Sequence, residues 1–120
     1  MTYTVELTAS ARANIAGVLA ASVEDFGARA RERYAALIAA ALVDLREDPF
    51  RRGSADRAEI RPGLRAYHLR HARDRAAGAE LRVGRPRHLV VYAVADERVV
   101  VLGVLHDAME LSLWVGAGDG

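Results

Sequence analysis

Four histidines, at positions 68, 71, 88 and 106, are the first candidates for chemistry in this sequence. His68 and His71 would share one face of a helix, but their segment has the pattern of a strand, where residues three apart point to opposite faces. His106-Asp107 is a pair with which one metal-dependent phosphohydrolase motif begins, yet that motif needs further His and Asp residues on flanking helices. The absence of cysteine excludes thiolate metal sites. We therefore predict no metal site and no cofactor.

An acid–base nuclease is the enzymatic alternative that these residue types allow. Arginine guanidinium groups would hold a scissile phosphate through paired hydrogen bonds, and a histidine would transfer the proton. Residues that would gather for this purpose are Arg57, Arg65, Arg70, Arg87, His68, His88 and Tyr92. The other interpretation is that the arginines are solvated at strand edges and the histidines are packed or paired. We favour it, because arginine stays protonated and is a poor base, and we predict no catalytic residue.

The charge distribution indicates an anionic partner. The net charge is +1, but residues 51–90 carry 11 arginines and 4 acidic residues, a net charge of +7. The segment before them has a net charge of −2 and the segment after them −4. All 17 basic residues are arginine, which a GC-rich coding sequence would explain, but their clustering is a separate observation. A basic middle between acidic ends favours binding to an acidic surface.

Hydrophobic periodicity predicts the elements that position these side chains. Alternating apolar residues predict a short strand at 3–7, and apolar residues three or four apart predict two helices within 9–47, the first with Thr8 or Ser10 as its N-cap. The apolar stripe of the first helix consists of Ala11, Ile15, Val18, Leu19, Val23 and Phe26. That of the second consists of Tyr34, Leu37, Ile38, Ala41, Leu42 and Leu45, with Asp44 and Glu47 off the stripe. Only Gly27 separates the helices, so they should form an antiparallel hairpin, and Pro49 ends the second one. The other segments are expected to be a loop at 49–63, strands at 64–70, 88–94 and 99–105, an exposed connection at 71–86 and a helical turn at 107–113.

The predicted fold class is α+β, with the order β-α-α-β-β-β and a helical hairpin packed on one face of an antiparallel sheet. The segments 88–94 and 99–105 are apolar at nearly every position, which predicts strands covered on both faces. The hairpin covers one face. The other must be covered by the 71–86 connection, by the C-terminal segment or by a second chain, and we favour a partner.

Length and composition indicate one folded domain. The chain has 120 residues, of which 52% are hydrophobic and 28% charged. We assign residues 1–115 to this domain and expect residues 116–120 to be a frayed tail. No apolar run approaches the roughly 18–20 residues of a membrane span, and the N-terminus lacks the features of a secretion signal. A cytoplasmic protein with no membrane contact is the expectation.

Several short motifs in a fixed order resemble the RelE/ParE superfamily of bacterial type II toxins, and the ParE branch more closely. The most specific are Ile60-Arg61-Pro62-Gly63-Leu64-Arg65, then His88 followed by Tyr92, then Val104-Leu105-His106 followed by Met109. The wider similarity includes TASARANIAGVLAASVEDFG at 8–27, RYAALIAAALVDLREDPFRRGS at 33–54, RAEIRPGLRAYHLRHAR at 57–73, PRHLVVYAV at 86–94 and VLGVLHDAMEL at 101–111. The resemblance implies the same helical hairpin on an antiparallel sheet.

The resemblance also implies a function and partners. ParE-like toxins inhibit DNA gyrase by direct binding, whereas RelE-type relatives cut mRNA on the ribosome. This chain lacks the lysines and the basic, tyrosine-bearing tail of the RelE nucleases, and its 71–86 connection is longer than in many ParE sequences. The expectation is a non-enzymatic ParE-like toxin without sequence-specific nucleic-acid binding, neutralised by a ParD-like antitoxin. A ribosome-dependent endoribonuclease and an inactive, co-regulating family member remain the alternatives.

Two groups of site residues follow from this expectation. A ParD-like antitoxin with a flexible, acidic segment would bind the basic region. The residues assigned to that antitoxin or another anionic partner are Arg57, Arg61, Arg65, Arg70, Arg87, His88 and Tyr92. A short C-terminal segment offers apolar anchors in an acidic setting, as a protein target would require. The candidates for target contact are His106, Asp107, Met109, Leu111 and Trp114.

Overall fold

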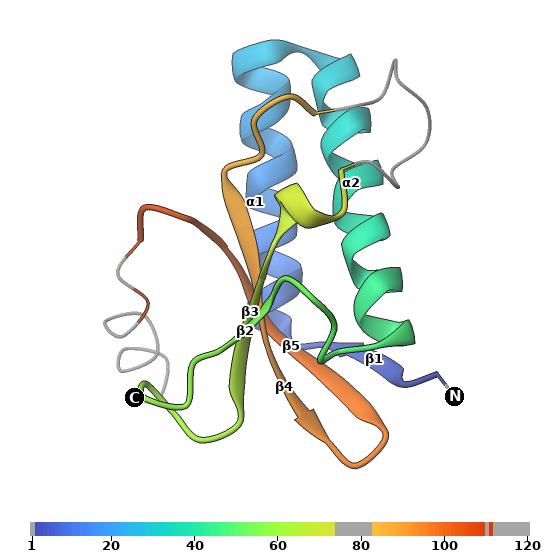
Figure 1. Cartoon of the computed structure of the whole chain (residues 1–120). Helices are drawn as coiled ribbons and strands as arrows, with labels where there is room; N and C mark the ends of the chain where they lie inside the picture. Colours follow the sequence, from blue (N-terminus) through green and yellow to red (C-terminus); the bar gives the residue numbers. More distant parts are fainter. Residues whose placement is uncertain (1, 74–82, 110, 112–120) are drawn as a thin grey trace.

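A computed structural model describes residues 2–73, 83–109 and 111 of the chain. A pair of long helices stands on one side of a twisted sheet, and the strands that follow them in sequence form most of that sheet (Figure 1). The elements in chain order are β1 (Thr4–Leu7), α1 (Ala9–Phe26), α2 (Ala28–Glu47), β2 (Ser54–Asp56), β3 (Leu64–His68), a 3₁₀ turn (Leu69–His71), β4 (His88–Ala95) and β5 (Arg98–His106). The α+β class with a helical hairpin on the sheet is confirmed.

Local signals place the ends of the helical hairpin where the sequence predicts them. The side chain of Thr8 accepts a hydrogen bond from the backbone N–H of Ala11 and so caps the start of α1. Gly27, with φ of +89°, joins the two helices in a conformation that side chains disfavour. Asp48 is extended, as expected before Pro49, and α2 ends there. Neither helix is long and apolar enough to cross a membrane, within the residues that the structure describes.

The sheet differs from the prediction in two details. It has the order β1-β5-β4-β3-β2, and β1 pairs with β5 in parallel, whereas the other pairs are antiparallel. Residues Ser54–Asp56, within the predicted 49–63 loop, form the edge strand β2. Three residues, Ser54, Ala55 and Asp56, are too few to show a strand period. Alternation also defines only which face a side chain occupies, and not the direction of the neighbouring strand.

The main core lies between the helices and one face of the sheet. The apolar stripe predicted for α2 is confirmed, because Leu37, Ile38, Ala41 and Leu45 are buried in it. Val91 pairs with Gly103 and Tyr92 with Val101, so that a bulge leaves Leu102 without an opposite residue. This bulge lets Val101 and Val104, three residues apart, both join the core.

The second face of the sheet is covered in part by the chain itself. Leu64, Val91, Leu105 and Leu111 form a small buried cluster, with Ile60 packed against it. Leu111 folds back from the C-terminal segment, so the chain itself supplies part of the cover that we had assigned to a partner, while Leu89 and Leu102 stay partly exposed. Of the helical turn predicted at 107–113, the structure describes residues 107–109 and 111. Residues 107–108 form a turn directly after β5. Residues 74–82 of the predicted connection and the predicted frayed tail lie outside the described residues.

Exposed apolar surface is found instead at the far end of α1. We predicted Val23 and Phe26 on the core-facing stripe, but their exposed fractions are 41% and 79%. Figure 1 shows the reason: the helical hairpin extends beyond the part of the sheet on which its other end packs. Helix periodicity identifies a face, but it does not tell how far along that face the partner surface continues.

Two glycines provide a matched test of backbone conformation. Gly53 has φ of +98°, and a Cβ there would lie 2.8 Å from the His71 ring, which stacks on Tyr67. Gly53→Ala is therefore expected to destabilise the fold by about 2 kcal/mol. Gly17 lies within α1 with nothing within 4 Å of a Cβ, so Gly17→Ala should stabilise it by about 0.5–1 kcal/mol. Urea unfolding of both variants measures the difference, and equal shifts of the same sign would contradict it.

Candidate functional site

Three histidines from neighbouring strands meet at one end of the sheet. His68 ends β3, His88 begins β4 and His106 ends β5. His88 lies directly opposite His106 in the β4–β5 register, and their rings contact edge to face with centroids 5.4 Å apart. Tyr34 of α2 approaches His88 in the same edge-to-face manner. The antiparallel pairing thus assembles a cluster from residues that are up to 72 positions apart in sequence (34 to 106).

Backbone hydrogen bonds determine which ring nitrogen carries the proton in two of these histidines. Nδ1 of His106 accepts from the N–H of Ala108 at 3.1 Å, and Nδ1 of His68 accepts from the N–H of Arg70 at 3.1 Å. A backbone N–H can only donate, so both Nδ1 atoms are unprotonated and both rings carry their proton on Nε2. Nε2 of His68 then donates to the carboxylate of Asp107 at 3.0 Å.

The third histidine is held by a tyrosine. The hydroxyl oxygen of Tyr34 accepts the N–H of Arg87 at 3.0 Å and lies 2.6 Å from Nδ1 of His88. All these groups are satisfied when the Tyr34 hydroxyl donates a hydrogen bond to Nδ1 of His88. The imidazole proton of His88 is then on Nε2, as in the other two rings. Burial, followed by the charge of His106, lowers the pKa of His88 to about 4. Burial raises the pKa of Tyr34 above its usual value.

Asp107 connects the ends of three strands. Its carboxylate accepts from Nε2 of His68 and pairs with Arg87 at 3.1 Å, and its N–H donates to the carbonyl of Arg87 at 2.8 Å. The hydrogen bond from His68 and the charge of Arg87 lower the pKa of this carboxyl group. A residue that we assigned to target contact is thus occupied with bonds inside the chain.

The low pKa of His88 predicts a pH-dependent stability. Unfolded His88 titrates near its ordinary pKa of 6.5 and folded His88 near 4, so protons favour the unfolded chain in this interval. Stability from this group is present above pH 6.5 and decreases as the pH falls toward 4. His106, Arg87 and Asp107 surround the ring and remain in a His88→Gln variant. Urea midpoints of the variant should change less between pH 7 and pH 5 than those of the natural chain, and an equal change would contradict this assignment.

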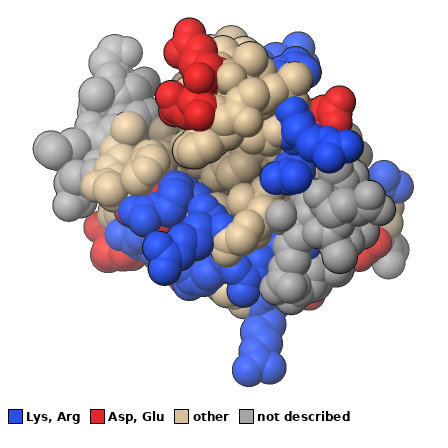
Figure 2. Space-filling view, turned by 90° about the horizontal axis from the view of Figure 1, so that it is seen from above, with Lys and Arg blue, Asp and Glu red and all other residues tan. Residues whose placement is uncertain are grey.

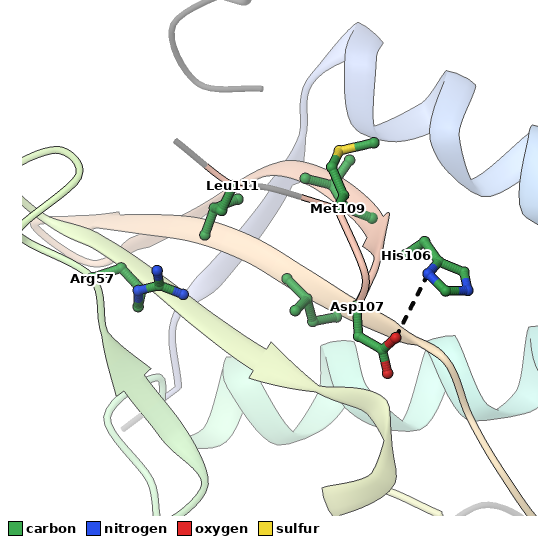
Figure 3. Close-up of a pocket in the computed structure, with 7 residues that line it drawn as sticks. Arg57, His106, Asp107, Met109 and Leu111 are labelled. Carbon is green, nitrogen blue, oxygen red and sulfur yellow. Dashed lines mark ion pairs between the residues drawn. The ribbon is translucent and has the colours of Figure 1, made fainter. Parts of the chain in front are cut away.

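The C-terminal segment forms the wall of a small pocket beside this cluster. Figure 3 shows His106, Asp107, Met109 and Leu111 around it, with Arg57 on the opposite side. Four of the five predicted target-contact residues are therefore neighbours in space, and the fifth, Trp114, lies outside the described residues. Met109 is 48% exposed, whereas Leu111 is 6% exposed and belongs to the second-face core. Of the large apolar side chains described in this segment, Met109 is thus the one that a target protein is able to reach.

The predicted partner contacts do not form a single surface. Arg65 and Tyr92 belong to a second network, in which Arg65 donates to Ser54 at 2.9 Å and stacks over Phe50. The hydroxyl of Tyr92 bonds to Ser54 and to the carbonyl of Pro49, and its side chain is fully buried. Burial raises the pKa of Tyr92, which keeps it neutral. We predicted Tyr92 as a contact, but it is a packing residue that joins β4 to the segment after α2.

The other predicted contacts lie in two places. Arg57 and Arg61 are in the turn between β2 and β3, where Arg57 pairs with Glu59 at 2.6 Å. Arg70 and Arg87 line a hollow at the histidine end of the sheet together with Arg73 and Arg85. Figure 2 looks onto this end and shows arginine side chains, in blue, around a hollow of uncharged side chains.

Sequence reasoning missed the part of Tyr34 in the cluster and the bond of His68 to Asp107. Tyr34 was placed on the apolar stripe of α2, and His68 was considered with His71 as a metal ligand and with His88 as a nuclease candidate. No local spacing links either residue to His88, because the contact depends on strand pairing. No group of three or more His, Cys, Asp or Glu side chains is placed to hold a metal ion in the described ranges.

Comparison with known proteins identifies the family. Residues 5–111 match the ParE toxin of the type II toxin-antitoxin system, parDE. No curated protein matches the sequence significantly. The family match includes both helices, β2 to β5, β1 from Val5 onward and the C-terminal pocket segment through Leu111. The chain therefore belongs to the ParE toxin family of type II toxin–antitoxin systems.

Proposed function

We propose that this ParE-family toxin inhibits DNA gyrase by binding to it directly, catalyses no reaction of its own, and is neutralised in the bacterial cytoplasm by a ParD-like antitoxin. A toxin of a type II system has a cognate antitoxin, and the gyrase target and the kind of antitoxin are the parts that we add. The observation that supports a protein target best is Met109, a half-exposed apolar side chain at the edge of a pocket. Large apolar anchors of this kind supply much of the energy of protein interfaces.

The separation of Arg65 and Tyr92 from the other nuclease candidates supports a non-enzymatic action. Arg87 and His88 belong to the histidine cluster, whereas Arg65 and Tyr92 are bonded to Ser54 in a separate network. A phosphodiester cleavage site needs its cation, acid and base around one phosphate. Tyr92 is also fully buried, so it has no access to a substrate.

The exposed end of α1 supports an antitoxin that folds on binding. Val23 and Phe26 present apolar surface next to a region rich in arginine. The apolar residues of a disordered acidic segment would bury Val23 and Phe26, and its carboxylates would pair with the neighbouring arginines.

Two assays on the same purified toxin test the proposal. We expect inhibition of gyrase supercoiling, and no cleavage of mRNA on translating ribosomes. A nuclease would lose a factor of about 10² or more in rate when a proton-transfer group is removed. Cleavage that is present in the natural chain and absent in His88→Ala would therefore overturn the proposal in favour of a RelE-like endoribonuclease. Failure to affect gyrase at any concentration would remove gyrase as the target.

A further inference from the structure

An open groove lies between the helical hairpin and the histidine end of the sheet. Its volume is about 730 Å³, within the range of sites that bind groups of nucleotide size. One wall is the exposed half of α1 and the beginning of α2, and the other is the segment 83–88 with His106. Residues that the argument uses are Val18, Phe26, Arg33, Arg85, His88 and His106.

The groove is lined by hydrogen-bond donors that have no acceptor. The Nδ1 atoms of His88 and His106 are both occupied, so each ring presents an Nε2–H group, and neither Nε2 has a partner among the described residues. Nε of Arg33 is buried and also lacks a hydrogen-bond partner there. Such a buried donor is costly without an acceptor, whereas the two Nε2–H groups are not buried and can also donate to water. An oxygen-rich anion in the groove would accept hydrogen bonds from these two groups.

The charges around the groove have the sign that such an anion requires. Arg33, Arg85 and Arg87 line it, against the single carboxylate of Asp25. A second hollow, lined in part by the same 84–87 segment, shares Arg85 and Arg87 and adds Arg70 and Arg73, against the carboxylate of Asp107, which is paired with Arg87 and His68. The two hollows therefore share part of their cationic lining. A ligand with a single charge would contact only a part of this cationic lining.

The opposite wall is apolar and carries an aromatic ring. Phe26 is 79% exposed at the end of α1, and Val18 lies on the same wall. Proteins that bind single-stranded nucleic acid combine a cationic track for the phosphates with aromatic rings on which bases stack. An acidic peptide would pair with the arginines too, but unlike a polynucleotide it does not carry both a planar ring and an anionic group on every residue along two adjoining hollows.

We propose that this groove binds single-stranded nucleic acid without sequence preference, with Arg85, Arg87 and the Nε2–H groups of His88 and His106 on the phosphates and Phe26 stacked on a base. Donors aimed at phosphate carry no sequence information, so the affinity should not depend on base order. The inference is independent of the identity of the toxin's target. An acidic antitoxin segment would compete for the same arginines, so the site belongs to the free toxin.

Fluorescence anisotropy of a labelled short oligothymidylate with the antitoxin-free, full-length chain tests the proposal. We expect binding that weakens steeply between about 50 and about 200 mM salt, since phosphate contacts release counterions. Arg85→Gln, at an exposed position, should weaken binding about tenfold and reduce the slope of the salt dependence by about one. Phe26→Ala should weaken binding by about 5- to 150-fold, the cost of one lost stacking contact.

Arg98→Gln is the matched control. Arg98 is also an exposed arginine, but it begins β5 at the end of the strand opposite to His106 and pairs with Glu6. Its replacement changes the net charge equally and should leave the affinity within twofold of the natural chain. Equal losses in Arg85→Gln and Arg98→Gln would overturn the proposal, because they would indicate general charge attraction. Absence of salt-dependent binding, or binding of a glutamate-rich peptide but not of the oligonucleotide, would overturn it as well.

Discussion

Replacing Met109 by glutamate is expected to abolish growth arrest in cells that express the toxin without its antitoxin. Met109 is half exposed at the edge of the pocket between the C-terminal segment and Arg57. If this side chain enters a cavity on gyrase, a carboxylate there would be buried without a partner. Loss of such an anchor costs 2 kcal/mol or more of binding energy, which corresponds to a loss of affinity of about 30-fold or more.

The measurement combines growth arrest with gyrase supercoiling by the purified variant. Met109→Leu, of similar volume and polarity, should keep both activities. Val43→Glu places the same charge on an exposed apolar position of α2 and should also keep them. Circular dichroism and an unchanged urea midpoint would show that Met109→Glu still folds. Full toxicity of a folded Met109→Glu variant would place the target surface elsewhere on the molecule.

A truncation of the whole segment would be a less informative experiment. Leu111 is buried against Leu64, Val91 and Leu105, and Asp107 holds His68 and Arg87. Removing every residue after Leu105 would therefore expose the second face of the sheet and break the histidine network. Lost toxicity would then report lost structure as much as lost target contact, which is why a single exposed side chain is the better test.

Asp44→Ala is expected to destabilise the folded chain by about 3–5 kcal/mol. Asp44 is 3% exposed within α2. Its carboxylate accepts a hydrogen bond from the Tyr67 hydroxyl at 2.8 Å and lies 3.6 Å from the guanidinium of Arg51. Arg51 also donates to the backbone carbonyl of Asp44 at 3.2 Å. Removing one member of a buried, hydrogen-bonded ion pair leaves its partner groups without the charge and the acceptor that they need. The resulting loss of stability is among the largest that a single substitution causes.

Urea unfolding compares this variant with two controls. Glu47→Ala removes an exposed carboxylate one turn further along α2 and should cost less than about 0.5 kcal/mol. Asp44→Asn keeps an oxygen that accepts from Tyr67 and should lose less stability than the alanine variant. Equal free energies of unfolding for Asp44→Ala and Glu47→Ala would show that the buried carboxylate contributes nothing to the fold.

Asp44 also illustrates where reading the sequence failed. A charged residue off the apolar stripe of a helix is expected to face solvent, and we placed Asp44 there with Glu47. The residue is buried because β3 brings Tyr67, and the segment after α2 brings Arg51, to that side of the helix. Tyr67 is 23 positions from Asp44, and Arg51, seven positions away, lies beyond the end of α2 at Glu47, so the pairing leaves no helical pattern.

The sequence by itself determined the elements whose periodicity is long and regular, and the family. The apolar stripe of α2, the Thr8 cap, the Gly27 junction and the apolar hairpin of β4 and β5 are local features, each explained by residues a few positions apart. Tertiary structure alone decided the parallel pairing of β1, the edge strand β2 and the burial of the second sheet face by Leu111. It also decided the cluster of Tyr34, His68, His88, His106 and Asp107. The physical reason is the same in each case: side-chain period defines a face, whereas strand order and register, which depend on distant contacts, define the neighbours on that face.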